Sequence, residues 1–393
     1  MLIEIHMIQN HSPSNLNRDD LGAPKTCLFG GVTRARISSQ CLKRSIRRSA
    51  EFQRALEKGG GVRTRRLVAI LSERAHGSPS APHDLIELVT KAFEKGGVKK
   101  DPTKDDPHAT NILLFVPEGT VVAMAKAVKA EYGKPAAQRT ADGLAETLTE
   151  LLGQKASVPD IALCGRMTEL DSDGLFRKID FRVEAALAAA HAISTHEAIN
   201  EVDYFTAVDD QAVGTGAGHV NEAMFASACF YKHFCIDWNQ LLDNLGGDEP
   251  LASTTVCQFL RAAAMNVPSG KQKSFAAFNP PDGILVEVKH EHRLPISYAN
   301  AFADPVPLKT LRGLIGESIA RLGQHVHDIT AGYGVKAKRF WFSPAGRHRL
   351  TWIDRTAKEG EKEKLAIDGE DGTFDSFDKF VSAVMQELGR TAS

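Results

Sequence analysis

Residues 15–48 read NLNRDDLGAPKTCLFGGVTRARISSQCLKRSIRR, and they contain eight basic and two acidic side chains. The stretch begins as a polar loop. After two consecutive glycines, the period-two pattern of VTRARI predicts a strand that carries Arg34 and Arg36 on the same face. Ser38 or Ser39 is a favourable N-cap for a helix that we expect to continue to about residue 58, where a triple glycine ends it. The stretch therefore predicts a loop, a strand and a basic helix in succession.

The basic residues of this helix are spaced so that like charges lie side by side. Lys43 and Arg47 are four positions apart, and so are Arg44 and Arg48. Such pairs repel each other in an isolated helix, and a bound polyanion relieves the repulsion. Residues 34–66 carry eleven basic side chains and two acidic ones, although the whole chain has a net charge of −1. We therefore expect a local surface that binds phosphates.

Composition limits the class of protein. The chain has 393 residues, of which 25% are charged, and no apolar run approaches the length of a membrane span. The first residues lack the pattern of a signal peptide, so we expect a cytoplasmic protein without a membrane partner. Six cysteines without a C-x-x-C pair predict buried free thiols, with no metal site and no cofactor. The glycine-rich segments 214–219 and 267–274 do not have the spacing of nucleotide-binding loops.

Hydrophobic patterns along the chain alternate between strand-like and helix-like segments. Residues 64–155 consist of helical segments separated by polar loops, which is typical of an inserted helical subdomain. Residues 201–237 form two strand-like arms around a glycine-rich tip, which predicts a hairpin. Further strands are expected at 2–9, 158–167, 284–290 and 337–344, and further helices at 181–196, 308–323 and 375–389. The absence of regular strand–helix alternation indicates the α+β class.

The run from Asn15 to Arg44 resembles the N-terminal signature of the CasC-type backbone subunit of the type I-E CRISPR surveillance complex, Cascade. Other segments match the same family in the expected order. They are DIALCGRM (160–167), VEAALAAAHAISTH (183–196), DYFTAVDD (203–210), SACFYKH (227–233) and VPSGKQKSFAAFNPPD (267–282).

The resemblance implies a modified RNA-recognition-motif (ferredoxin-like) palm with an inserted helical fingers subdomain and a β-hairpin thumb. The corresponding boundaries are 1–60 for the first part of the palm, 61–156 for the fingers, 157–195 for the second part of the palm, 196–222 for the thumb and 223–393 for the remainder of the palm. It also implies a protein without catalytic activity that polymerises along the CRISPR RNA and displays the guide for pairing with target DNA in antiviral defence. Its expected partners are the CRISPR RNA, target DNA, further copies of itself and other Cascade subunits.

The candidate RNA-binding residues fall into three groups. The N-terminal stretch supplies phosphate contacts at Arg18, Lys25, Arg34, Arg36, Ser38, Gln40, Lys43, Arg44 and Arg47. The resemblance places Met167, Phe205 and Thr206 beside a displaced base. Lys271, Lys273 and Ser274 are weaker candidates for the same groove.

Two alternative functions belong to other classes. Related backbone subunits of type III complexes cleave target RNA with a loop aspartate, so Asp19 and Asp20 would serve a metal-dependent ribonuclease. The second alternative is a general module that binds single-stranded RNA. Stepwise assembly on RNA of increasing length separates the backbone subunit from this module, and magnesium-dependent cleavage identifies the ribonuclease.

Overall fold

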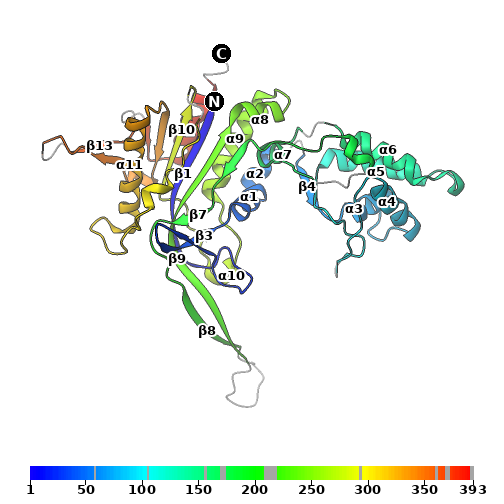
Figure 1. Ribbon diagram of the computed structural model, residues 1–393, viewed down its shortest axis with the longest axis horizontal. Coiled ribbons are helices and arrows are strands. Elements are labelled where there is room, and N and C mark those ends of the chain that lie inside the picture. Colours follow the sequence, from blue (N-terminus) through cyan, green and yellow to red (C-terminus); the bar gives the residue numbers. More distant parts are fainter. Residues whose placement is uncertain are drawn as a thin grey trace. The chain divides into compact units, whose positions relative to one another are not determined.

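The computed structural model describes residues 1–56, 59–103, 106–154, 157–168, 174–207, 219–291, 294–358, 362–367 and 372–389, with backbone only at 206–207 and 219–221. The chain divides into two compact units (Figure 1). Unit 1 comprises residues 1–52, 187–238 and 253–393, and unit 2 comprises residues 53–186 and 239–252.

Unit 1 is built on a ten-stranded sheet with the order β14-β11-β10-β1-β9-β7-β3-β2, in which β6 and β8 also pair with β9. The strands are β1 (Leu2–Ser14), β2 (Thr26–Phe29), β3 (Val32–Ile37), β6 (Leu187–Ala189), β7 (Ala192–Ser194), β8 (Glu201–Ala207), β9 (His219–Asp237), β10 (Gly283–Lys289), β11 (Lys338–Phe342) and β14 (Thr373–Phe374). At the centre, Glu4 of β1 lies opposite Glu287 of β10 and Cys235 of β9. A smaller sheet pairs β12 (Thr351–Ile353) with β13 (Glu363–Leu365).

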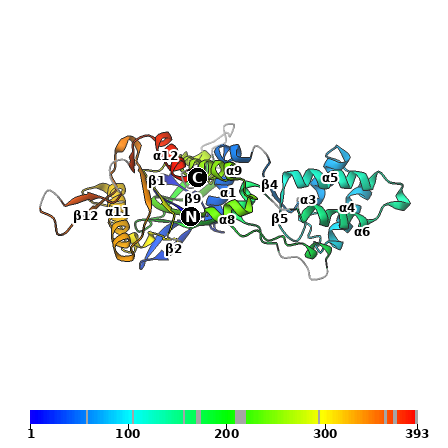
Figure 2. The same ribbon diagram turned by 90° about the horizontal axis from the view of Figure 1, so that it is seen from above.

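Helices cover both faces of this sheet (Figure 2). On one face, Leu322 and Val326 of α11 (Gly313–Tyr333) belong to the same apolar cluster as Ile8 and Trp341. The other face carries α9 (Glu249–Met265) and α12 (Phe377–Gly389), where Phe259 packs on Phe234 at 5.4 Å and Phe380 on Phe342 at 5.7 Å between ring centroids. The remaining helices of unit 1 are α1 (Ser39–Arg47), α2 (Ala50–Gln53), α10 (Gln272–Phe275) and the 3₁₀ turns η4 (Ala299–Phe302) and η5 (Pro344–Gly346).

Unit 2 is mainly helical. It contains α3 (Leu67–His76), α4 (His83–Lys95), α5 (Glu118–Tyr132), α6 (Ala141–Leu152), α7 (Pro159–Cys164), most of α8 (Trp238–Asn244), the 3₁₀ turns η1 (Arg54–Leu56), η2 (Ala136–Gln138) and η3 (Leu175–Lys178), and the two-stranded antiparallel sheet of β4 (Gly61–Thr64) and β5 (Leu114–Pro117). Leu71, Val89, Met124 and Leu148 are buried in one apolar core. The helical segments predicted within residues 64–155 are therefore confirmed, because each supplies one apolar face to this core.

Two expected elements are wrong. Residues 159–164 form a helix rather than a strand, because Pro159 occupies the first helical turn and the apolar run is too short to indicate its period. Residues 187–194 form two short strands rather than an alanine-rich helix, because both pair with β9. Neighbouring strands thus override local helix propensity.

The basic helix is also shorter than expected. Helix α1 ends at Arg47, because the Ser49 hydroxyl donates to the Ile46 carbonyl at 2.8 Å and accepts from the Phe52 amide at 3.1 Å. Ser49 therefore starts a new turn. In contrast, the strand at 32–37, the hairpin of β8 and β9 and the mixed α and β composition are confirmed. No described helix is both long and apolar enough to cross a membrane.

Candidate nucleic-acid interface

The N-terminal loop is held in place by its asparagines. Asn15 Nδ2 donates to the carbonyls of Gly22 at 2.9 Å and of Met224, on β9, at 2.8 Å. Asn17 Oδ1 accepts from the Ser38 amide at 2.9 Å, and the Asn17 carbonyl accepts from the Lys25 amide at 2.9 Å. The loop is thus tied both to β9 and to the start of α1, which fixes the backbone at Arg18 and Lys25.

Helix α1 presents its polar side to solvent next to this loop. The Ser38 hydroxyl accepts from the Cys41 amide at 3.3 Å, so Ser38, one of the two serines expected from the sequence, is the N-cap. Leu42 and Ile46 are buried beneath the helix. Gln40 and Arg44 are therefore exposed, while Lys43 is half-buried.

Segments far apart in the sequence enclose one cavity of about 530 Å³ in unit 1. Its walls are residues 16–22 of the N-terminal loop, residues 41–45 of α1 and residues 268–270. The third wall, residues 268–270, packs closely against the N-terminal loop, because a side chain at Gly270 would overlap the carbonyl oxygen of Leu16. Only the tertiary fold brings these walls together, and Arg18 and Arg44 both line the resulting cavity. We call it the guide cavity.

Five cations of the N-terminal loop, β3 and α1 have no acidic partner in the described part of the chain, and two of them line the guide cavity. Among the residues that the structure describes, Arg18, Lys25, Arg36, Lys43 and Arg44 form no ion pair. Several arginines of unit 2 differ in this respect, and their pairs include Arg65–Asp101, Arg66–Asp106 and Arg74–Glu118. The unpaired cations of unit 1 therefore leave a positive surface that attracts phosphates.

Arg36 is partly engaged within the protein. Its Nε donates to the Thr26 carbonyl at 3.1 Å, and its guanidinium lies 3.0 Å from Nδ1 of His191. Burial lowers the pKa of His191, and the charges of Arg36 and Lys25 lower it further. A neutral imidazole that accepts a hydrogen bond from Arg36 agrees with this direction.

The prediction that Arg34 faces a phosphate is wrong. Its side chain is 0% exposed, and its guanidinium donates to the carbonyls of Phe29, Ser194, Phe302 and Ala303 at 2.8–3.1 Å. The period-two pattern of β3 is correct, but the C-terminal end of η4 covers the face on which Arg34 lies. Arg34 therefore connects the β2–β3 hairpin to β7 and to the C-terminal end of η4.

Lys271, Lys273 and Ser274 are exposed on α10 and the turn that precedes it. Gln272 is buried and donates to the carbonyls of Pro268 and Ala277, which holds this turn. Lys271 has a positive φ of 52°, a sparsely populated conformation for a lysine. These three candidates lie directly after the third wall of the guide cavity without lining it.

The three candidates expected beside a displaced base lie in different parts of the chain. Phe205 on β8 belongs to unit 1 and is 46% exposed. Met167 belongs to unit 2 and is 79% exposed. The side chain of Thr206 and the glycine-rich tip at 208–218 lie outside the described residues. The structure thus presents Phe205 and Met167 as exposed apolar groups, and their proximity to a base remains a prediction.

The two aspartates of the loop line the guide cavity without forming a metal cluster. Asp19 Oδ1 accepts from the amides of Leu21 and Ala23, both at 2.9 Å, which is the use of an aspartate in a turn. Among the described residues, only Glu4, His6 and His233 bring three potential metal ligands within 4.8 Å of one another.

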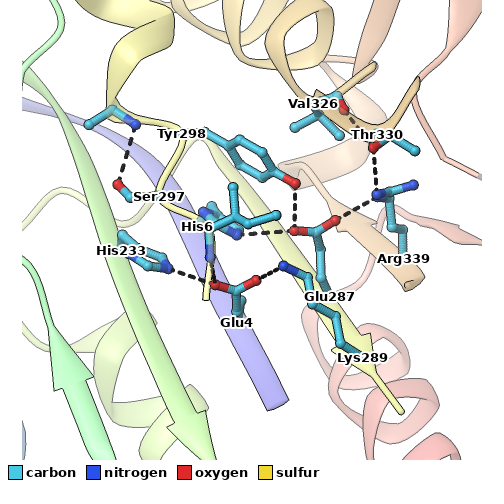
Figure 3. Close-up of polar contacts among 12 residues, drawn as sticks. Glu4, His6, His233, Glu287, Lys289, Ser297, Tyr298, Val326, Thr330 and Arg339 are labelled. Carbon is cyan, nitrogen blue, oxygen red and sulfur yellow. Dashed lines mark hydrogen bonds and ion pairs between the residues drawn. The ribbon is translucent and has the colours of Figure 1, made fainter. Parts of the chain in front are cut away.

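This buried cluster is part of a charge-balanced network (Figure 3). Lys289 donates to Glu4, while Arg339 Nε donates to Glu287 at 2.6 Å and the Tyr298 hydroxyl donates to Glu287 at 2.9 Å. Two carboxylates thus face two cations. A divalent ion beside Lys289 and Arg339 would add uncompensated positive charge, so the cluster is better suited to a polar core than to a metal site.

Electrostatics in the network favour ionised carboxylates. Burial raises the pKa of Glu287, but His6, Arg339 and Lys289 outweigh this effect and hold that pKa at about 2. Burial lowers the pKa of His6, whose ring stacks on that of His233 at 4.7 Å between centroids. The network therefore contains two ionised carboxylates beside neutral His6.

Sequence reasoning missed several residues that shape the guide cavity. Asn15 and Asn17 position the loop, and Ser45, Pro268 and Ser269 line the cavity. The two asparagines stand two positions apart in the sequence NLN. Because asparagine side chains often bond to nearby backbone groups, this pair could have indicated that they hold the loop. No local pattern indicated that residues 268–270 pack against Leu16.

The comparisons with known proteins agree with this architecture. None of the curated proteins matches the chain. A solved chain described as "CRISPR RNA-guided surveillance complex, pre-nicking" is 29% identical with a TM-score of 0.76, covering 98% of this chain and 100% of that chain. A second, described as "CRISPR RNA-guided surveillance complex", is 24% identical with a TM-score of 0.67, covering 98% and 100%.

The likeness extends over nearly the full length of both solved chains, and it confirms the resemblance to CasC-type Cascade proteins that residues 15–44 indicated. The family model described as "CT1975-like protein" matches residues 3–367. The chain therefore belongs to the CT1975-like protein family.

Proposed function

We propose that this protein is a backbone subunit of a type I-E Cascade-like complex that binds the CRISPR RNA through the guide cavity. The observation that carries the proposal is the convergence of the N-terminal loop, α1 and residues 268–270 on one cavity lined by Arg18 and Arg44. Neither arginine has an acidic partner among the described residues. Contacts to phosphates rather than to base edges suit a protein whose guides differ in sequence.

The assembly that we propose is a row of copies along one RNA. Unit 1 supplies the palm, in the form of an elaborated RNA-recognition motif, and the hairpin of β8 and β9 is the thumb. The helices of unit 2 are the fingers. Successive copies would make head-to-tail contacts, and the length of the RNA would limit their number. Bases left exposed between thumbs would pair with target DNA.

We further propose that the protein is not an enzyme. Asp19 already accepts hydrogen bonds from two backbone amides of its own loop, which supports a structural role for this carboxylate. Within the described part of the chain, no third ligand joins Asp19 and Asp20 in a metal-binding group. The ribonuclease alternative thus has no specific observation in its favour.

The test is the mass of the purified protein on single-stranded RNAs of increasing length and unrelated sequence, measured by light scattering with magnesium present. We expect one further subunit for each fixed increment of RNA, with the RNA intact. A single subunit at every RNA length would contradict the proposed assembly. Shortened RNA would support the ribonuclease alternative instead.

A double variant tests whether the guide cavity is the RNA-binding site. Replacing Arg18 and Arg44 by alanine removes two phosphate contacts, so the slope of log affinity against log salt should fall by roughly 1.4, at about 0.7 for each contact. The matched control replaces Arg355 and Lys358, two exposed cations of the same unit outside the guide cavity. Equal slopes for both double variants would exclude the guide cavity as the RNA site.

A further inference from the structure

A second cavity, with a positively charged lining, lies in unit 1 between the start of α11, the segment after β11 and the small sheet of β12 and β13. It has a volume of about 760 Å³ and shares no lining residue with the guide cavity. Arg312, Arg347, His348 and Arg349 line it, with Glu363 as the acidic residue of the lining. We call it the α11 cavity. Its charge is strongly positive for one site on a chain whose net charge is −1.

The acidic residue does not neutralise the α11 cavity. Arg312 is 3.7 Å from Glu363, and the Thr351 hydroxyl donates to the same carboxylate at 2.7 Å. Glu363 is therefore already engaged. Arg347 is exposed and pairs with no carboxylate among the described residues, so its guanidinium is available to an incoming anion.

His348 supplies a second independent feature. Its backbone amide donates to Ser343 Oγ at 3.2 Å and its carbonyl accepts from the indole of Trp341 at 2.8 Å, which fixes the residue. Its ring atom Nε2 is nevertheless buried without a hydrogen-bond partner in the described structure. A buried polar atom left unsatisfied by the protein has a free-energy cost that a bound ligand can remove.

The first turn of α11 adds backbone donors near His348. Arg312 is the N-cap residue of this 21-residue helix, and no side chain caps the helix. A Cβ at Gly316, in the first turn, would lie 4.0 Å from Cε1 of His348. The imidazole therefore lies near a helix N-terminus, where the amides that follow Gly313 and the helix dipole favour an anion.

The turn before Arg347 has an unusual backbone. Ala345 has a φ of 51° and Gly346 a φ of 64°, so two consecutive residues are left-handed. For alanine this conformation costs free energy, and such residues tend to occur where a binding site is held in shape. The turn of η5 thus places Arg347 and His348 in the lining of the α11 cavity at a local energetic cost.

We infer that the α11 cavity binds a phosphodiester group of single-stranded nucleic acid, at a second site separate from the guide cavity. The planar guanidinium of an arginine can donate two parallel hydrogen bonds to two oxygens of a phosphate. The helix N-terminus supplies amide donors to the same anion. Ile319, Ala320 and Leu365 line the same cavity and offer an apolar surface to a sugar or base. A cavity of about 760 Å³ accommodates a nucleotide rather than a lone ion.

The two sites lie on different sides of the central sheet. The α11 cavity is built on α11, whose apolar residues pack on the face that carries Trp341. The guide cavity is built on α1, and Ser45 of α1 accepts a hydrogen bond at 2.6 Å from Asn266, at the end of α9 on the opposite face. A strand in the α11 cavity would therefore be distinct from the part of the guide held in the guide cavity.

The experiment uses the full-length protein preloaded with unlabelled RNA and a fluorescent ten-nucleotide oligothymidylate as the probe, followed by anisotropy. Arg347→Ala should weaken probe binding about tenfold and lower its salt slope by roughly 0.7. Arg347→Lys, which keeps the charge, should restore part of the affinity. Arg355→Ala is the matched control, because it removes an exposed arginine of the same unit that lies outside this cavity, and it should leave the probe affinity unchanged.

Three outcomes would overturn the inference. The first is equal probe binding by Arg347→Ala and Arg355→Ala. The second is Arg347-dependent binding of inorganic phosphate without binding of the oligonucleotide, which would indicate a free-anion site. The third is displacement of the probe by poly-glutamate as effectively as by unlabelled oligothymidylate, which would indicate an acidic protein segment. Failure of the RNA loading itself would appear separately in the mass measurement and would concern only the proposed function.

Discussion

Arg34 and Arg36 lie two positions apart on β3 and have different surroundings. Arg34 and Arg36 alternate on one strand and are chemically equivalent in the sequence. In the structure, four backbone carbonyls surround the guanidinium of Arg34, whereas Arg36 is half-buried. The difference arises from residues 302 and 303, which are distant in sequence and carry no charge.

Replacing Arg34 by methionine should therefore reduce the free energy of unfolding rather than weaken RNA binding directly. Four carbonyls would lose their donor. Unsatisfied buried groups each cost about 1–3 kcal/mol, so we expect a loss of about 3 kcal/mol or more in urea denaturation. Lys25→Met, at a half-buried cation of the neighbouring loop, is the control and should change stability by less than about 1 kcal/mol.

The same measurements can contradict the structural role of Arg34. If Arg34→Met retained full stability and reduced the salt slope of RNA binding, its guanidinium would have to leave the carbonyls and reach phosphate.

At the scale of secondary-structure elements, β8 presents different side chains on its two faces. Phe205 is 46% exposed and Val202 is 44% exposed, and their odd and even positions place them on opposite faces of the strand. The sequence indicated this hairpin from two strand-like arms, and the pairing of β8 with β9 confirms it.

Phe205→Ala should weaken RNA binding by about 1–3 kcal/mol for each occupied site if the ring stacks on a base. Val202→Ala removes a comparably exposed apolar group from the other face and should leave the affinity unchanged. Fluorescence titration with RNA gives both values. Equal losses for the two variants would show that the hairpin contributes general apolar surface instead of a stacking position.

The buried network on β1, β9, β10 and β11 predicts how stability depends on pH. The pKa of Glu287 is about 2 in the folded protein, below its ordinary value of 4.5. Its ionised carboxylate therefore stabilises the fold fully above pH 4.5, and this contribution, on the order of 3 kcal/mol, is lost as pH falls toward 2. Glu4, whose pKa is also lowered, should act in the same direction.

Glu287→Gln tests this dependence. The variant leaves the buried guanidinium of Arg339 without its charged partner, so its free energy of unfolding at pH 7 should be lower than that of the wild type by about 3–5 kcal/mol. The difference should shrink as the pH approaches 2, where the wild-type carboxylate becomes protonated. Urea denaturation between pH 2 and pH 7 gives the two curves, and a difference independent of pH would contradict the assignment.

At the scale of the whole molecule, the guide cavity depends on a contact between residues 15–16 and residue 270. Gly270→Ala would place a methyl group against the carbonyls of Asn15 and Leu16 and push the third wall away. Overpacking of this kind costs typically 1–3 kcal/mol. We expect a loss of stability in this range together with weaker RNA binding.

Gly119→Ala is the matched control for that change. Gly119 lies in α5 of unit 2, and a Cβ there would meet nothing within 4 Å. Its replacement should stabilise the helix by up to about 1 kcal/mol and leave RNA binding unaltered. If Gly270→Ala behaved like this control in both measurements, residues 268–270 would not form a wall of the RNA site.

The sequence by itself determined the local features of this protein. Period-two and helical patterns located β3, β8, β10, β11, α11 and α12, and the spacing of residues 15–44 identified the family, because both depend on neighbours in the chain. The tertiary structure decided what depends on distant partners. Pairing with β9 turned an alanine-rich segment into strands, carbonyls near η4 enclosed Arg34, and packing of residue 270 on Leu16 completed the guide cavity. These contacts join residues that no local pattern relates.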